Sequence, residues 1–129
     1  MAGCNDDDAC TDDTCDPDLG CSHVPFTGFE AILCRCDQPL PVACLTEILP
    51  ENIETGRARA CDLIAQAGAD AHRSRRLLLR AARVVKHLQR KAKRAGDQTL
   101  SPTCSAALQE EFRTLRELAR DYARSLPRP

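Results

Sequence analysis

The sequence predicts an all-α fold, a small antiparallel bundle of three to four helices preceded by an irregular disulfide-rich knot. Nine cysteines occur among 129 residues, and residues 1–34 contain no Lys or Arg. Residues 73–94, in contrast, contain ten Lys or Arg and no acidic residue. Apolar residues in the second part repeat with helical spacing. We therefore expect an acidic cysteine-rich region over residues 1–25 and a helical bundle with a basic third helix over residues 26–129.

The acidic N-terminal region has neither a helical nor a strand period. Its Asp, Thr, Gly and Pro residues are typical of turns, and it has little to bury, so covalent bridges must hold its shape. Zinc ligands usually come in C-x2-4-C pairs, whereas Cys4, Cys10, Cys15 and Cys21 contain no such pair, which favours disulfides. Of the three possible pairings we expect Cys4–Cys15 with Cys10–Cys21, because interleaved bridges constrain a short loop more fully than nested ones.

Four helices are expected after this region, over residues 26–36, 50–68 and 70–95 and over a C-terminal stretch that begins at Ser101. Prolines stop the first helix, and Pro50 suits the first turn of the second. Gly96 closes the third helix, because glycine commonly follows a helix end. Ser101 is expected as the N-cap of the fourth, with Pro102 at its first helical position. Short connections imply antiparallel neighbours.

The remaining cysteines are expected to staple the bundle. An up-down-up arrangement brings the start of the fourth helix beside the start of the second, which predicts a Cys44–Cys104 bridge. Cys61 lies in the middle of the second helix and can meet the first helix, which predicts Cys36–Cys61. The alternative for Cys61 is a buried free thiol that packs as a small apolar residue. One of these later cysteines would stay unpaired within the chain if the first four pair among themselves.

The predicted third helix has two unlike sides. At 100° per residue its apolar residues fall within an arc of about 120°, and its cations spread over the rest. Such a surface can bind nucleic acid, an anionic polysaccharide or an acidic membrane surface. The alternatives are a solvated face or docking of the acidic N-terminal region onto it. No aromatic residue interleaves with the arginines, which makes single-stranded nucleic acid the less favoured ligand. The candidate polyanion-binding residues are Arg76, Arg80, Arg83, Lys86, Arg90, Lys93 and Arg94.

Calcium is the candidate metal ligand. Asp6, Asp8, Asp13 and Asp16 offer the hard oxygen donors that Ca²⁺ requires. Their spacing is not that of an EF-hand loop, and no bidentate Glu stands at the required distance. The alternative is that these aspartates cap turns and keep the surface polar.

The chain is not expected to be an enzyme. It contains no G-x-S-x-G, H-E-x-x-H or glycine-rich phosphate-binding motif. A thiol oxidoreductase is the enzymatic alternative, through Cys34-Arg35-Cys36. That segment lacks the C-x-x-C spacing of the common redox motif.

The segment from Cys4 to Pro25 follows the pattern C-x-D-x3-C-T-x-D-x-C-D-P-x2-G-C-x-H-x-P. It resembles the slime-mould (Dictyostelium-type) cysteine-rich repeat of extracellular matrix and bacterial surface proteins. The matching residues are Cys4, Asp6, Cys10, Thr11, Asp13, Cys15, Asp16, Pro17, Gly20, Cys21, His23 and Pro25. The resemblance implies an extracellular, usually tandemly repeated module of structural or adhesive character without known catalysis. The helical remainder resembles C-terminal segments of bacterial exported proteins, which implies no function.

The expected location is extracellular or at the cell surface. Met1-Ala2-Gly3 leads directly into the first cysteine, without a signal peptide, so we expect the chain to be a fragment of a longer exported protein. No apolar run is long enough to span a membrane. We therefore expect a non-enzymatic structural or interaction module of a surface or matrix protein, whose partners are other surface proteins or anionic polysaccharide. The alternative is a module that binds polysaccharide or nucleic acid through the basic helix 73–94.

Overall fold

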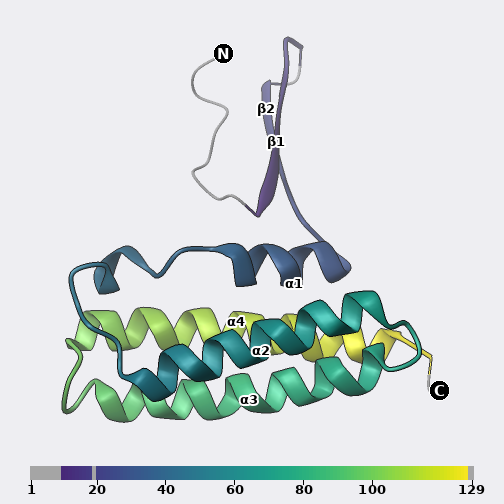
Figure 1. Cartoon of the computed structure of the whole chain (residues 1–129). Helices are drawn as coiled ribbons and strands as arrows, with labels where there is room; N and C mark the ends of the chain where they lie inside the picture. Colours follow the sequence, from purple (N-terminus) through teal and green to yellow (C-terminus); the bar gives the residue numbers. More distant parts are fainter. Residues whose placement is uncertain (1–9, 19, 128–129) are drawn as a thin grey trace.

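The chain folds into a helical bundle with a projecting β-hairpin, as described by a computed structural model over residues 10–18 and 20–127 (Figure 1). The elements are β1 Thr11–Asp16, β2 Gly20–Pro25, α1 Gly28–Asp37, the 3-10 helix η1 Val42–Cys44, α2 Glu51–Ala69, α3 Ser74–Ala95 and α4 Pro102–Ser125. The predicted helical class is confirmed, with a small two-stranded sheet added. Within the described residues, no helix has both the length and the apolar character needed to cross a membrane.

The N-terminal hairpin corrects the expectation of an irregular knot. β1 pairs with β2 in antiparallel register, with Thr11 opposite Pro25 and Cys15 opposite Cys21. Gly20 takes a φ of 85° where the chain turns back, a conformation that glycine adopts without strain. The described side chains of the two strands are exposed. Alternation of apolar and polar residues appears where one face of a sheet is buried, so this ribbon has no such sequence signal.

Helices α2, α3 and α4 run up, down and up, and α3 packs against both of its neighbours. Helix α1 lies on the other side of the bundle, against α2 and α4, so that α1 and α3 form opposite outer layers (Figure 1). The core is aliphatic, with Phe112 as its largest fully buried side chain. Its other large members are Ile32, Ile53, Ile64, Leu77, Leu78, Val85, Leu88 and Leu108.

The helix ends follow the sequence signals closely, with two differences. Ser101 caps α4 as predicted, its Oγ accepting from the amide of Cys104 at 3.1 Å. Helix α3 begins at Ser74 and not at Asp70, because Asp70 is extended and its carboxylate accepts from the amide of His72. Gly96 does follow α3, but with a right-handed φ of −62°. Glycine is required at this position for a steric reason, because a Cβ there would lie 2.5 Å from Ser105 Oγ.

Three described disulfides join elements that are distant in sequence, namely Cys10–Cys34, Cys36–Cys61 and Cys44–Cys104. The last two are the bridges that the sequence predicts, and the free-thiol alternative for Cys61 is wrong.

The predicted Cys10–Cys21 bridge is also wrong. Strand pairing places Cys21 opposite Cys15, with their sulfurs 3.9 Å apart, while Cys10 at the base of the hairpin meets Cys34 of α1. As a result all the cysteines from Cys34 onward are bridged, and none of them is the expected leftover thiol. The predicted partner of Cys15, Cys4, lies outside the described residues.

Candidate polyanion-binding surface

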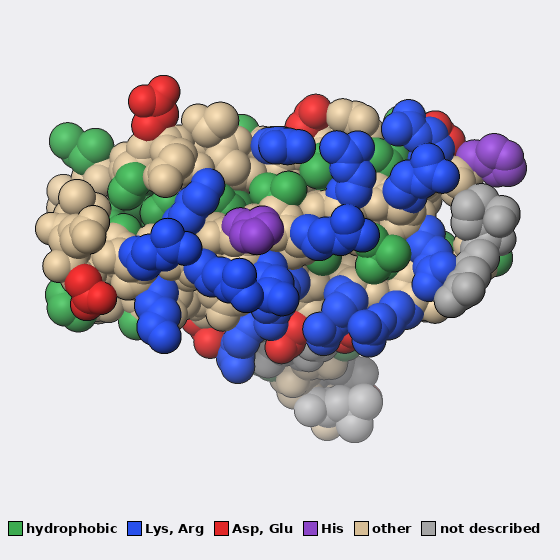
Figure 2. Space-filling view, turned by 90° about the horizontal axis from the view of Figure 1, so that it is seen from below, with side chains coloured by type: hydrophobic (Ala, Val, Ile, Leu, Met, Phe, Trp, Pro, Cys, Tyr) green, Lys and Arg blue, Asp and Glu red, His purple; other side chains and the backbone are tan. Residues whose placement is uncertain are grey.

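The outer face of α3 carries a broad cationic surface. The buried residues of this helix lie on one side, toward α2 and α4, because its apolar residues recur with helical spacing. Figure 2 shows the opposite side, where Lys and Arg side chains spread across the molecule and acidic side chains lie at the edges. All seven candidate residues on α3 are exposed. The structure therefore brings the predicted polyanion-binding residues together on one accessible face.

The α3 cations have no acidic partner among the described residues. The ion pairs that the structure gives there, Arg113–Glu110 and Arg120–Asp121, both lie on α4. Arg75 of α3 instead donates from Nε to the Ala123 carbonyl of α4 at 3.2 Å. Uncompensated like charges on one face raise the local electrostatic potential and attract anions.

Helix α4 adds a second row of cations that the sequence analysis missed. Arg116, Arg120 and Arg124 recur every four residues, which places them on one flank of the helix. The structure turns that flank toward α3. The spacing is visible in the sequence, but the direction of the flank depends on which neighbour α4 packs against.

Two hollows lie between these rows. One, of about 270 Å³, is lined by Leu79, Ala82, Arg83, Lys86, Arg116, Arg120 and Arg124. The other, of about 310 Å³, is lined by Lys86, Gln89, Arg90, Lys93, Gln109 and Arg116. Four of the seven predicted residues thus border α4. Arg94 instead lines a separate hollow with Pro50, which precedes α2, and with Asn52 of α2.

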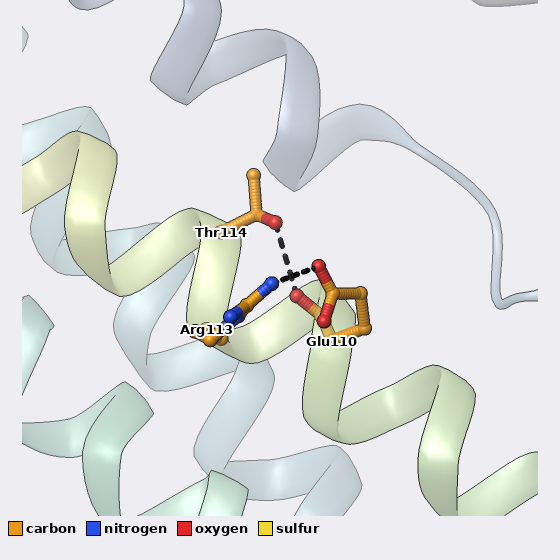
Figure 3. Close-up of polar contacts among 3 residues, drawn as sticks. All are labelled: Glu110, Arg113 and Thr114. Carbon is orange, nitrogen blue, oxygen red and sulfur yellow. Dashed lines mark hydrogen bonds and ion pairs between the residues drawn. The ribbon is translucent and has the colours of Figure 1, made fainter.

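Two arginines of α4 differ sharply in their surroundings. Arg113 pairs with Glu110, whose backbone carbonyl also accepts from Thr114 Oγ1 at 3.0 Å (Figure 3). The Glu110 carboxylate raises the pKa of Arg113 above its ordinary value. Arg116, in contrast, has a buried Nε without a hydrogen-bond partner in the structure. Arg113 is therefore compensated locally, while Arg116 is not.

The acidic hairpin does not cover the cationic surface. It projects from the side of the bundle where α1 lies, and α3 forms the opposite side (Figure 1). The Cys10–Cys34 bridge ties the base of the hairpin to α1. The alternative in which the acidic region docks on the basic helix is therefore not realised by the hairpin.

The calcium candidates are only partly placed by the structure. Asp6 and Asp8 lie outside the described residues, and Asp13 and Asp16 belong to β1. In the part of the chain that the structure describes, no group of three or more His, Cys, Asp or Glu residues is arranged to hold a metal ion. Calcium binding stays a prediction.

The Cys34-Arg35-Cys36 segment does not form an internal redox pair. Cys34 is bonded to Cys10, and Cys36 is bonded to Cys61. Each sulfur is thus committed to a bridge that joins two separate elements, which gives the thiol oxidoreductase alternative no support.

No family model, curated protein or solved structure matches the chain.

Proposed function

We propose that this chain is a non-enzymatic, extracellular interaction module that binds a polyanion through the outer face of α3. One observation carries the proposal: α3 buries its apolar arc and exposes its cations, which lack acidic partners among the described residues. A face that served only to keep the protein soluble would be expected to mix charges of both signs. A surface of one sign favours association with an opposite charge.

Export is supported by the covalent framework. Three disulfides join distant segments of the described chain, and such bridges persist in oxidising compartments. The resemblance of residues 4–25 to an extracellular repeat points in the same direction. We place the module within a longer surface or matrix protein, where the helical bundle would contact polyanions outside the cell.

Retention on immobilised heparin tests this function. The Arg80→Gln/Arg83→Gln variant removes two positive charges from exposed positions of α3 and keeps good helix formers. We expect it to elute at lower salt than the parent protein, because fewer cations contact the polyanion. Both proteins are eluted with the same salt gradient.

Arg113→Glu is the matched control for this experiment. It changes the net charge by the same two units, but at a position of α4 that pairs with Glu110 and lines neither hollow between α3 and α4. The control is expected to elute close to the parent. Coelution of all three proteins would contradict a binding role for the α3 face.

A further inference from the structure

Two hollows follow one another along the α3–α4 boundary, and a third adjoins the first on α3. The two described above share Lys86 and Arg116 as wall residues. A third hollow, of about 190 Å³, shares Leu79 and Arg83 with the first and adds Arg75 and Arg76. Because neighbouring hollows share walls, we treat them as one feature, the α3–α4 furrow. From Arg75 to Lys93 it follows α3 for about 27 Å, at about 1.5 Å per residue.

The furrow has cations on both walls and one amide side chain from each helix. Helix α3 contributes Arg83, Lys86, Arg90 and Lys93, and α4 contributes Arg116, Arg120 and Arg124. Arginine binds carboxylate and sulfate-like groups through two parallel hydrogen bonds. Gln89 and Gln109 supply amide groups that both donate and accept, as hydroxyl groups of a sugar require. The lining thus suits a ligand that combines anionic groups with hydroxyls along an extended chain.

Arg116 marks the centre of this furrow. It lines both of the larger hollows, at the point where they meet. Its Nε is buried without a hydrogen-bond partner, an arrangement that is costly for a charged donor group. Because that Nε has no contact with solvent in the structure, the Arg116 side chain would have to turn toward an anionic group in the furrow to donate to it from Nε.

The furrow is poorly suited to nucleic acid. Its described lining contains no aromatic side chain on which a base could stack. The aromatic pair Phe29–Tyr122 joins α1 to α4, on the side of α4 away from α3. The disulfides also favour an oxidising compartment, in which polysaccharides are the more available polyanions.

We infer that the α3–α4 furrow binds a single chain of a linear acidic polysaccharide, whose carboxylate or sulfate groups pair with arginines of both helices. This inference rests on the proposed function and extends it, because it makes α4 an equal wall of the site. It also assigns the α4 arginines to ligand binding and names the ligand class.

Titration with size-fractionated heparin oligosaccharide tests the α4 wall. The Arg116→Gln/Arg120→Gln variant should bind about 100-fold more weakly than the parent, on the order of tenfold for each lost charged contact. The slope of log affinity against log salt should fall by about two. Arg113→Glu, with the same change in net charge on the same helix, should bind within a few-fold of the parent.

The possible outcomes separate the inference from the proposed function. Loss of binding in Arg80→Gln/Arg83→Gln but not in Arg116→Gln/Arg120→Gln would overturn the furrow and leave the function standing. Absence of binding by the parent would overturn both. Equal affinity for a single-stranded oligonucleotide of the same charge would overturn the ligand class.

A second measurement needs no variant. In the parent protein, saturating oligosaccharide should protect Arg116 and Arg120 from modification by phenylglyoxal, as read by peptide mass spectrometry. Arg113, which pairs with Glu110 outside the furrow lining, should react as it does without ligand. Unchanged modification of Arg116 in the saturated complex would overturn the inference, independently of how well any variant folds.

Discussion

Glu47 and Ser101 form a polar contact between residues 54 positions apart. The Glu47 carboxylate accepts from the Ser101 amide at 2.8 Å and from its hydroxyl at 2.6 Å. These hydrogen bonds lower the pKa of Glu47 below its ordinary value. A carboxyl whose pKa is lower in the folded state stabilises the fold above its unfolded pKa. That stabilisation is lost as the pH falls through the folded value.

We expect Glu47→Gln to weaken the acid dependence of stability. The parent should lose free energy of unfolding on acidification more steeply than the variant, in which the amide does not titrate. Urea denaturation at a series of pH values between neutral and acidic measures both profiles, and their difference isolates Glu47 from the other carboxyl groups. Parallel profiles would show that the Glu47–Ser101 contact does not stabilise the folded protein.

The sequence predicts the N-cap role of Ser101 but not its contact with Glu47. Ser101 is readable as an N-cap because Ser followed by Pro is a local helix-start signal. Its contact with Glu47 depends on how the bundle closes, and no local pattern encodes that. Arg116 is a similar case: its spacing is visible in the sequence, but its partial burial beside α3 is a consequence of packing.

At the scale of elements, α3 and α4 approach each other closely where Ser105 of α4 lies beside the end of α3. Ser105 of α4 donates from Oγ to the Ala92 carbonyl of α3 at 2.7 Å. A Cβ at Gly96 would lie 2.5 Å from that Oγ and 2.6 Å from the Ser105 Cβ. Because Gly96 has a helical φ, its backbone tolerates alanine and only the steric conflict remains. Gly96→Ala should therefore destabilise the protein by about 1–3 kcal/mol, as overpacking does, measured by urea denaturation.

A double-mutant cycle identifies the cause of that effect. Ser105→Gly removes both of the atoms that the new methyl group would meet. In the Ser105→Gly background, Gly96→Ala should cost little, which gives a coupling energy between the two sites. If the cost is the same in both backgrounds, the conflict lies elsewhere between α3 and α4.

Helices were easier to predict from this sequence than the hairpin. Long amphipathic stretches with cap residues mark α2, α3 and α4, and their starts differ from expectation by four residues at most, at Ser74. The described side chains of β1 and β2 are exposed, and the two strands lack the alternation that identifies strands with one buried face. The wrong bridge for Cys10 has the same origin, because no local pattern indicates the strand register that places Cys15 opposite Cys21.

At the scale of the whole molecule, the described disulfides lie away from the α3–α4 furrow. Cys10–Cys34 and Cys36–Cys61 secure α1 and the base of the hairpin, while Cys44–Cys104 ties η1 to the first turn of α4. The central furrow residues Arg116 and Arg120 follow Cys104 by more than three helical turns, on the order of 18–24 Å along α4. Stability and polyanion binding should therefore respond to different substitutions.

The Cys44–Cys104 bridge spans a sequence separation of 60 residues and is fully buried. By chain entropy, Cys44→Ala/Cys104→Ala should lower the free energy of unfolding by about 4 kcal/mol, a large share of the ordinary stability of a small domain. Cys36→Ala/Cys61→Ala, with a separation of 25 residues, should cost slightly less, about 3.5 kcal/mol. Chemical denaturation under oxidising conditions measures both variants, and a loss below about 1 kcal/mol in the first would contradict its role as a staple.

The same variants test whether binding in the furrow requires the disulfides. Below its unfolding transition, Cys44→Ala/Cys104→Ala should still bind heparin oligosaccharide within a few-fold of the parent, because the bridge touches neither wall at Arg116 or Arg120. Hydrogen exchange should increase near Ser101 and Cys104, where the cap and the bridge meet. It should change little across the furrow, whose walls are joined by the Arg75–Ala123 hydrogen bond and by the aliphatic contacts of α3 with α4. Loss of binding in the folded variant would instead show that the start of α4 sets the spacing of the two cationic rows.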